Sequence, residues 1–366
     1  MTYDVKAGKA VLIEVAITLA RYWSAYLMDM WWQTTDYAYH HSSLNGHPAW
    51  VDADGKVRIV FSIEDPEVPC IRAPQFPFMS SEALQSWIGR AQTVDDVAAP
   101  GPLAGLASLL DHVTPPWISG ELPPLAHWLY FLPCQRQSLL DTDGHAKRGD
   151  FLPPVPLPRR MWAGSRVRFL APIPLGAVVR RCSTIVNVTA KTGRTGPMVL
   201  VTVKHEVMVG TTTAVIEEQD IVYRGVAGPG DGALVTAGSD RAATGTEAPR
   251  LSQATRRLAP DPVQLFRFSA LTFNAHRIHY DRGYARDVEG YPGLVVHGPF
   301  VATLLMDHFL RCSSGRTVRA FSFRGHRPLF DTAPFDLCQA TNEVGGDLWA
   351  VDVNGAVAFT ATVECV

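Results

Sequence analysis

The chain has 366 residues, of which 47% are hydrophobic and 19% are charged, and its formal net charge is -2. This composition excludes a disordered chain, and the length is enough for two domains, or for one large domain with an appendage. Because nucleic-acid-binding proteins concentrate Lys and Arg to neutralise phosphates, a nearly neutral chain without a long basic run is not expected to bind nucleic acid.

The six cysteines are scattered along the chain and form no CxxC pair. Without such pairs a structural zinc site is not expected. In a chain of this size cysteines usually pack as small apolar core residues. Unpaired cysteines are typical of a reducing compartment, so we expect the protein in the cytoplasm.

The first 78 residues begin with a largely apolar segment, residues 10–32, that Glu14, Arg21 and Asp29 interrupt. Each charge at the centre of a membrane span costs on the order of 3 kcal/mol to insert. A signal peptide would have a cleaner apolar segment and a small-residue cleavage site. The segment is therefore expected to form an amphipathic helix in water, with no membrane span.

Two further features lie in these 78 residues. Ala53-Asp54-Gly55 is expected to turn a β-hairpin between residues 49–51 and 57–61. His40, His41 and His47 could be read as metal ligands, but no carboxylate stands at ligand spacing. We therefore expect them at or near the surface and expect no metal site.

Residues 79–226 combine short helices with a strand-rich region. Residues 82–89 are expected to form a capped helix that Gly89 ends, and a second short helix is expected at 103–110. The proline-rich run 152–158 can be neither helix nor central strand, so it must cross the molecule in an extended form. Strands are expected at 166–170, 178–188, 198–209 and 212–222, with Gly193 and Gly196 in the loop between the second and third.

Residues 227–249 have the Gly, Ala, Thr and Ser content of a linker. In the region that follows, residues 250–366, helices are expected at 261–271 and 299–312, the first beginning with Asp261-Pro262. Strands are expected at 317–324, 335–343, 348–353 and 356–363, with a type I′ turn at Asn354-Gly355. The two strand-rich regions share their content without a clean sequence repeat, which only suggests a duplication.

Residues 268–281 concentrate polar side chains at the end of an expected helix: Asn274, His276, Arg277, His279 and Asp281. His297-Gly298-Pro299 follows at the start of the next expected helix. Side chains at one helix end can transfer protons, and the free N–H groups at another helix start can stabilise a developing oxyanion. This combination predicts chemistry on a thioester.

The same segment resembles the motif of the MaoC-like family of R-specific enoyl thioester hydratases, Ser-Gly-Asp-x-Asn-Pro-aliphatic-His, then five residues and a small residue. Aligning the final histidine places His279 on the catalytic histidine and Ala285 on the small residue. Asn274 falls on the catalytic Asp, and His297-Gly298 matches the His-Gly step before the central helix of the family.

Residues 79–366, including 151–164 and 284–293, resemble more specifically the branch of mitochondrial type 2 hydroxyacyl-thioester dehydratases and bacterial mesaconyl-C4-CoA hydratases. The resemblance implies an α+β double hot-dog fold, in which two antiparallel sheets each wrap a central helix. The expected divisions are an extra N-terminal segment (1–78), a hot-dog unit without a catalytic motif (79–226), the linker (227–249) and a catalytic hot-dog unit (250–366).

The resemblance implies a carbon–oxygen lyase that reversibly hydrates an enoyl thioester. Because Asn274 cannot accept a proton, we expect His279 to act as the single base, Asn274 to hold the attacking water and the Gly298 N–H to bind the thioester oxygen. His279→Ala should abolish turnover while leaving the fold intact. A structural role for His279 as a buried, satisfied histidine, and a turn or cap role for Asn274, remain alternatives.

The roles of the neighbouring polar residues stay more open. Asp281 suits an N-cap of the following segment better than a second catalytic carboxylate. Arg277 is a candidate partner for a free carboxylate on the substrate, His276 for contact with the substrate, and His297 for shaping the helix start. In the first half Arg159 and Arg160 could meet coenzyme A phosphates, although a solvated face is the favoured interpretation.

No redox or metal cofactor is expected, because the chain has no GxGxxG after a strand, no P-loop and no HExxH. Coenzyme A or acyl carrier protein would carry the substrate, and a short, branched dicarboxylic CoA ester is the leading specific expectation from the resemblance. A hot-dog thioesterase and a non-catalytic thioester-binding subunit are the rival functions. The oligomeric state stays open, with a homodimer as one alternative.

Overall fold

The computed structural model describes four short strands within the first 80 residues and then residues 81–193, 196–225, 251–313 and 315–366. The chain divides into two compact units, Met1–Phe78 and Met79–Val366. In the first unit β1 (Ala10–Ala16) pairs antiparallel with β4 (Lys56–Ser62), and β2 (Ser24–Tyr26) pairs with β3 (Ser43–Asn45).

The amphipathic helix expected over residues 10–32 is wrong, because β1 and β2 occupy parts of this segment. In β1, Val11, Ile13 and Val15 are β-branched, and side chains of this kind favour strands. The strand expected at 57–61 is confirmed as β4, but its partner is β1. The other hairpin strand and turn, the three histidines and the linker 227–249 lie outside the described residues.

The described residues of the second unit form four α-helices and ten strands. The helices are α1 (Ser81–Gln85), α2 (Pro100–Leu109), α3 (Pro262–Leu271) and α4 (Gly298–Cys312), with short 3₁₀ or π turns at Ala126–Leu129, Gln137–Leu139, Arg277–His279 and Tyr284–Val288. The strands are β5 (Ala91–Val97), β6 (Arg159–Phe169), β7 (Val178–Gly193), β8 (Gly196–Val209), β9 (Thr212–Arg224), β10 (Ala254–Leu258), β11 (Val318–Gly325), β12 (Phe335–Asn342), β13 (Gly345–Val351) and β14 (Val357–Cys365). Among the described residues, no helix is long and apolar enough to cross a membrane.

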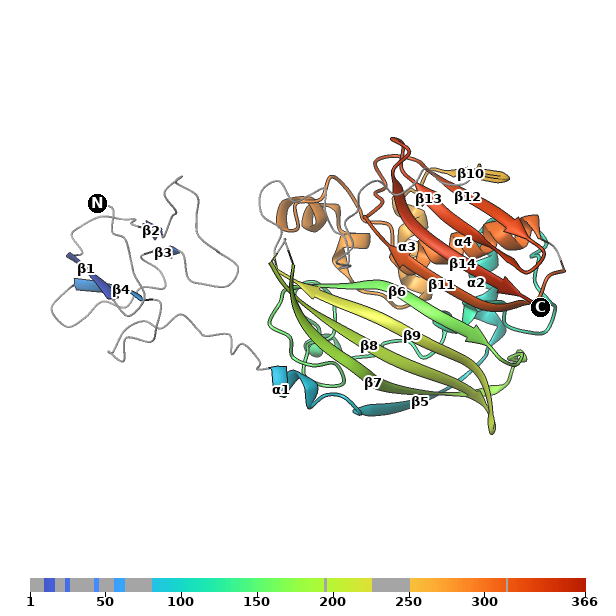
Figure 1. Cartoon of the computed structure of the whole chain (residues 1–366), viewed down its shortest axis with the longest axis horizontal. Helices are drawn as coiled ribbons and strands as arrows, with labels where there is room; N and C mark the ends of the chain where they lie inside the picture. Colours follow the sequence, from blue (N-terminus) through green and yellow to red (C-terminus); the bar gives the residue numbers. More distant parts are fainter. Residues whose placement is uncertain are drawn as a thin grey trace. The chain divides into compact units, whose positions relative to one another are not determined.

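All ten strands join one antiparallel sheet in the order β10-β12-β13-β14-β11-β6-β9-β8-β7-β5. The five strands of each half can be numbered 1 to 5 along the chain. Counted from the outer edge of the sheet inward, both halves then have the same strand order, 1-3-4-5-2. The halves meet where β6 pairs antiparallel with β11. This repeated strand order supports the duplication that the sequence only suggested. The topology is that of an α+β double hot-dog fold (Figure 1).

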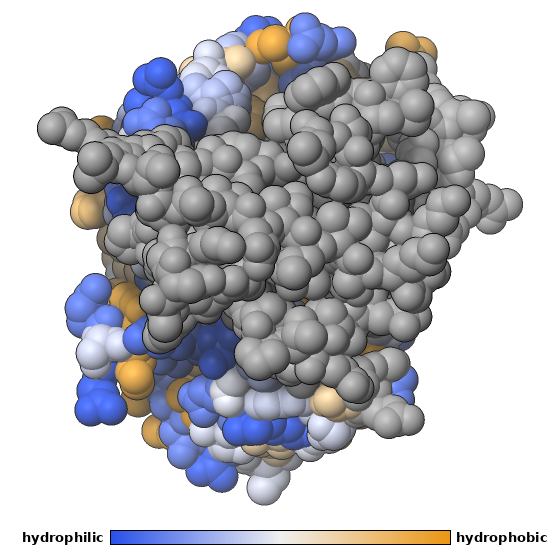
Figure 2. All heavy atoms as spheres, turned by 90° about the vertical axis from the view of Figure 1, so that its left-hand side faces the viewer, coloured by the Kyte–Doolittle hydropathy of each residue, from blue (hydrophilic) through white to orange (hydrophobic). Residues whose placement is uncertain are grey.

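The principal core lies where this curved sheet packs on its helices, as Figure 1 shows for α2, α3 and α4. α4 is the central helix of the second half, and every residue from Phe300 to Leu310 is buried. Mostly hydrophilic residues, with smaller hydrophobic areas among them, form the part of the described surface visible in Figure 2. The sheet therefore holds the N-terminal end of α4 in a fixed position, which matters for the site.

The seam between the halves depends on a close approach of backbones. Gly164 lies at a bulge in β6, and a Cβ there would overlap the carbonyl oxygen of Phe323 on β11. Only glycine allows the two strands to pair at this position. Arg160 and Trp162 of the same strand line the cavity described below.

Most expected elements of the second unit are confirmed, including α2, α3, α4 and the eight strands, although β6 begins seven residues earlier than expected and β7 ends five residues later. The helix expected at 82–89 is shorter, since α1 ends at Gln85. Asp261 caps α3, because its carboxylate accepts a hydrogen bond from the Gln264 N–H at 2.9 Å. The type I′ turn is wrong, because of the two turn residues only Gly355 has a positive φ, 76°. The Asp352 carboxylate instead accepts hydrogen bonds from the N–H groups of Asn354 and Ala356, so a side chain sets this turn.

Candidate active site

A cavity of about 1330 Å³ lies in the second unit and is lined by residues of both halves. Four of the six candidate site residues line it: His279, Asn274, His276 and Gly298. Arg277 and His297 are not among the lining residues. The structure thus brings the end of α3 and the start of α4 to the same cavity.

The chain reverses direction sharply after α3. Phe273 adopts a left-handed conformation with φ 49°, and the Asn274 N–H returns to the Ser269 carbonyl at 2.8 Å. The Asn274 side-chain oxygen accepts the His276 N–H at 3.0 Å. Asn274 therefore has the turn role that was left open, while its side-chain NH₂ group remains a donor beside the cavity.

His279 is held in one tautomer. Its Nδ1 lies 2.7 Å from the Val295 carbonyl oxygen, which can only accept, so Nδ1 carries the hydrogen and Nε2 has a free lone pair. The side chain is buried, and burial lowers its pKa to about 4, although the hydrogen bond to Val295 opposes the shift. At neutral pH His279 is therefore an uncharged ring with one basic nitrogen.

His297 lies against the ring of His279 rather than in the cavity. The two rings are stacked, with centroids 3.7 Å apart, and His297 Nε2 is 2.8 Å from the Ser269 hydroxyl. Burial, followed by the neighbouring His279 and His276, lowers the pKa of His297 well below its usual value. A neutral His297 thus supports the His279 ring and fixes the start of α4, for which it is the N-cap residue.

Gly298 is the first residue of α4, with Pro299 next and the Val301 N–H bonded to the His297 carbonyl. The N–H groups of a first helical turn have no partner within the helix and carry a partial positive charge. The nearest atoms to a Cβ at Gly298 would be the Trp162 carbonyl oxygen at 3.5 Å and the Phe359 ring at 3.8 Å. A Cβ at Gly298 would therefore be at ordinary van der Waals distance from its protein neighbours, and the residue lines the cavity.

Arg277 is occupied elsewhere. Its guanidinium forms an ion pair with Asp281 at 2.7 Å, lies 4.2 Å over the Tyr284 ring and donates to the Thr142 carbonyl. Asp281 also accepts the Tyr284 N–H at 3.0 Å, as expected for an N-cap. Arg277 is thus disfavoured as the partner of a substrate carboxylate, because it is paired with Asp281 and does not line the cavity.

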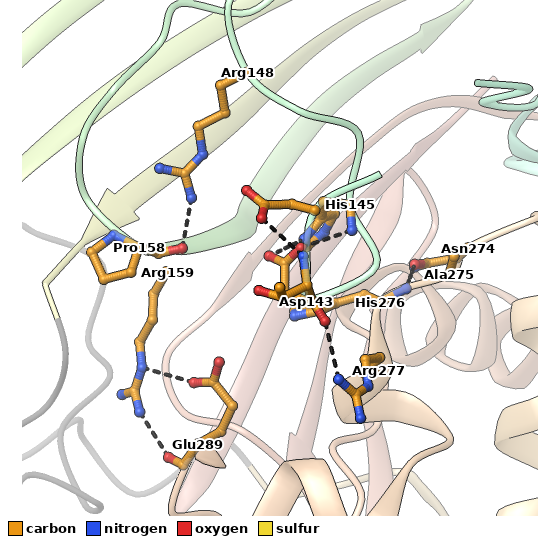
Figure 3. A network of polar contacts seen from close by, with 12 residues as sticks. Asp143, His145, Arg148, Pro158, Arg159, Asn274, Ala275, His276, Arg277 and Glu289 are labelled. Atoms are coloured by element: carbon orange, nitrogen blue, oxygen red, sulfur yellow. Dashed lines mark hydrogen bonds and ion pairs between the residues drawn. The ribbon is translucent and has the colours of Figure 1, made fainter. Parts of the chain in front are cut away.

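A loop of the first half that the sequence did not single out docks on this segment. Figure 3 shows Asp143 and His145 beside His276, and the Asp143 carboxylate accepts from His145 Nδ1 at 2.8 Å. The His145 and His276 rings lie 4.0 Å apart. Gly144 makes this approach feasible, because its φ is 91° and a Cβ there would overlap the Ala275 carbonyl oxygen.

Asp143, His145 and His276 form a polar cluster, and two of its members, His145 and His276, line the cavity. Burial raises the pKa of Asp143, but the hydrogen bond from His145 outweighs it and the pKa is lowered overall. Burial, together with His145 and His279, places the pKa of His276 far below its usual value. One ligand atom from each residue lies within 4.8 Å of the others, so the cluster could also hold a metal ion, which was not expected from the sequence.

The first half contributes a second buried network to the cavity wall. Burial raises the pKa of Glu217, but hydrogen bonds from His127 (3.0 Å) and Ser165 (2.7 Å) outweigh it and hold the pKa at about 2. Trp128 donates to the same carboxylate at 2.9 Å. No local motif signals this network, because its residues come from separate elements.

The solvated face expected for Arg159 is wrong. Arg159 is only 13% exposed and pairs with Glu289 across the two halves at 3.1 Å, as Figure 3 shows. Arg160 lines the cavity. Both arginines are therefore part of the structure around the site.

Solved structures with this fold define the class. The chain superposes on HtdX of Mycobacterium tuberculosis with a TM-score of 0.54 at 19% identity, over 76% of this chain and 100% of that one. A MaoC-like dehydratase matches with a TM-score of 0.55 at 15% identity, over 77% of this chain and 99% of that one. These likenesses show the fold: a MaoC-like double hot-dog protein.

Sequence relatives show the family. The profile described as hydroxyacyl-thioester dehydratase type 2 matches residues 125–331. The chain is 49% identical over 288 residues to the mesaconyl-C(4)-CoA hydratase of Chloroflexus aurantiacus, covering 78% of this chain and 99% of that protein. It is 37% identical over 92 residues to the mitochondrial type 2 hydroxyacyl-thioester dehydratase of Schizosaccharomyces pombe, 25% of this chain and 30% of that protein. The chain belongs to the hydroxyacyl-thioester dehydratase type 2 family and is a thioester hydratase/dehydratase, a carbon–oxygen lyase.

Proposed function

We propose that the protein reversibly adds water across the double bond of an enoyl-CoA, with His279 as the base. The observation that carries this proposal is the neutral His279 ring, whose Nδ1 is bound to the Val295 carbonyl and whose Nε2 is left basic, at a cavity that Gly298 also lines. A general base has to be unprotonated at the working pH and within about one bridging water of the reacting atom.

The proposed reaction uses one proton carrier. His279 Nε2 takes a proton from water while the water oxygen bonds to Cβ, and the double-bond electrons move onto the thioester oxygen as an enolate. The N–H of Gly298, at the positive end of α4, stabilises that oxygen. His279 then returns the proton to Cα on the same face. The Asn274 NH₂ group orients the water, since its oxygen is engaged by the His276 N–H.

The identity of the acyl group on the thioester substrate is a separate part of the proposal. The relative with 49% identity over nearly its whole length is a mesaconyl-C(4)-CoA hydratase, which supports the same substrate for this chain and coenzyme A as the carrier. Mesaconate is methylfumarate, so this thioester keeps one free carboxylate. A short dicarboxylic thioester would thus occupy the cavity.

A panel of enoyl-CoA esters tests this function. Purified protein should remove the enoyl absorbance of mesaconyl-C4-CoA fastest, without releasing free thiol, and His279→Gln should lower kcat by about 10²- to 10⁴-fold. Thiol release would indicate a hot-dog thioesterase instead. Binding without turnover across the panel would indicate a non-catalytic thioester-binding subunit. Wild-type rates in His279→Gln would refute the role of this imidazole.

A further inference from the structure

The chemical structure of the proposed substrate determines where a cationic side chain that binds its carboxylate must lie. In a C4 thioester of mesaconate the free carboxylate is bonded to Cβ, the carbon that receives the hydroxyl group. The group that binds this carboxylate must therefore lie next to the base that activates the water. This inference rests on the proposed dicarboxylic substrate, and it concerns which residue recognises it.

Among the described residues, one lysine and four arginines line the cavity: Lys147, Arg148, Arg160, Arg181 and Arg327. Lys147 and Arg327 are exposed, and Lys147 donates to the Ser138 carbonyl at 3.1 Å. Arg148 is tied to the proline-rich run, because its guanidinium donates to the carbonyls of Val155, Leu157 and Pro158 at 2.5–2.6 Å. Figure 3 shows this arginine directed at Pro158.

Arg181 belongs to the other network of the cavity. It lies 5.1 Å over the Phe131 ring and donates to the Phe131 carbonyl at 3.4 Å. Burial lowers its pKa, and the neighbouring Glu217 and Asp96 carboxylates oppose that shift. The negative charges of Glu217 and Asp96 near Arg181 would therefore oppose the binding of a further carboxylate there.

Arg160 remains. It lies on β6, opposite Tyr223 of β9 in the register of the sheet, and is partly buried. Burial raises the pKa of Tyr223, and the Arg160 guanidinium beside its hydroxyl opposes that shift, so Arg160 has an uncharged neighbour there. Among the residues that the structure describes, Arg160 forms no ion pair with an aspartate or glutamate. The nearest acidic group of the histidine cluster, Asp143, is held by His145 and does not line the cavity.

Arg160, His145, His276 and His279 line the same cavity, and the charge of Arg160 acts on the histidines. Burial is the largest cause that lowers the pKa of His145 and of His276, and the Arg160 charge lowers both further. His276 in turn lies 5.3 Å from His279, ring centre to ring centre. An unbalanced positive charge thus lies within the group of residues that surrounds the proposed base.

We propose that Arg160 binds the free carboxylate of a dicarboxylic mono-CoA ester and thereby selects it over monocarboxylic acyl-CoA esters. A planar guanidinium can bind a carboxylate through two parallel hydrogen bonds, which fixes the orientation of Cβ as well as its charge. Binding the carboxylate there holds Cβ on the side of the cavity where His279 delivers water.

Equilibrium binding of two unreactive thioesters tests this site. Succinyl-CoA and butyryl-CoA match in chain length, and only succinyl-CoA has a carboxylate on Cβ. By calorimetry the wild-type protein should bind succinyl-CoA about 10- to 100-fold more tightly than butyryl-CoA, the range expected for a charged hydrogen-bonded pair. In Arg160→Gln that preference should fall below about threefold, with butyryl-CoA binding retained.

Two further variants sharpen the result. Arg160→Lys keeps the charge and should keep part of the preference, whereas Arg327→Gln should change the binding of both esters by the same factor. An unchanged preference in Arg160→Gln, an equal loss of both esters in it, or loss of the preference in Arg327→Gln would overturn the assignment. Because neither ester reacts, the outcome is independent of the turnover panel that tests the proposed hydration.

Discussion

His279 illustrates how the surroundings of a single residue decide its chemistry. The Val295 carbonyl fixes the proton on Nδ1, and burial keeps the ring neutral down to a pKa of about 4. The same imidazole in water would be half protonated near pH 6.5. Burial therefore extends the range in which Nε2 can act as a base.

The pH dependence of kcat/KM checks this directly. We expect the rate to stay level from about pH 8 to pH 5 and to fall as the pH drops through about 4, because protonation removes the lone pair of Nε2. Circular dichroism at each pH separates this loss from unfolding. A fall in kcat/KM centred between pH 6 and 7, in protein that is still folded, would contradict a lowered pKa of His279.

The sequence alone predicted the residues at the end of α3 but not all of their surroundings. Asn274, His276 and His279 line the cavity as expected, because the motif fixes their spacing on one short segment. The sequence makes Arg277 a candidate for a substrate carboxylate, but its guanidinium pairs with Asp281 instead. Asp143 and His145 are more than a hundred positions away in the chain, so no local pattern could link them to His276.

At the scale of elements, the loop that carries Asp143 and His145 depends on its contact with the segment after α3. The Arg277 N–H donates to the Asp143 carbonyl at 2.9 Å, and Gly144 lies directly on the Ala275 backbone. The backbone therefore joins an element of the first half to the segment of the second half that carries His279. The loop has no freedom to accept a side chain at Gly144.

Gly144→Ala should separate the loop from the segment. The added Cβ would overlap the Ala275 carbonyl, and a displacement of about 1 Å near a reacting group can cost about 10²-fold in rate. We expect kcat/KM to fall by about 10- to 100-fold, measured on the enoyl-CoA substrate.

Gly120→Ala is the matched control for this change. Gly120 also has a positive φ, 84°, but a Cβ there would meet nothing within 4 Å. It therefore carries the same backbone strain without the overlap, and its kcat/KM should stay at the wild-type value. Equal losses in both variants would assign the effect to strain alone and refute the docking role of Gly144.

At the scale of the whole molecule, two five-strand sheets of the same strand order join at β6 and β11 into one sheet. The cavity draws residues from both halves, although only the second half carries the recognisable motif. The first half is thus part of the site, through the loop at Asp143 and through Arg160. Met1–Phe78 forms a separate compact unit.

Removal of the first unit tests its role. A chain of Met79–Val366 should fold and should hydrate the substrate at the wild-type kcat/KM within about twofold, because a compact unit with its own core folds independently. Thermal unfolding and steady-state kinetics of the shortened chain provide the measurement. A loss of turnover in a folded shortened chain would show that the N-terminal residues contribute to catalysis.

The sequence by itself determined most elements of the second unit and the segment after α3 that lines the cavity, because alternation, helix caps and the His279 motif are local properties of consecutive residues. It misassigned Ala10–Ala16, where a short apolar run suits a helix or a strand equally well and only pairing with β4 decides. The tertiary structure alone decided which distant residues meet at the cavity. Sheet pairing at Gly164 and loop docking at Gly144 bring Arg160, His145 and His276 together, and neither contact leaves a periodic signal in the chain.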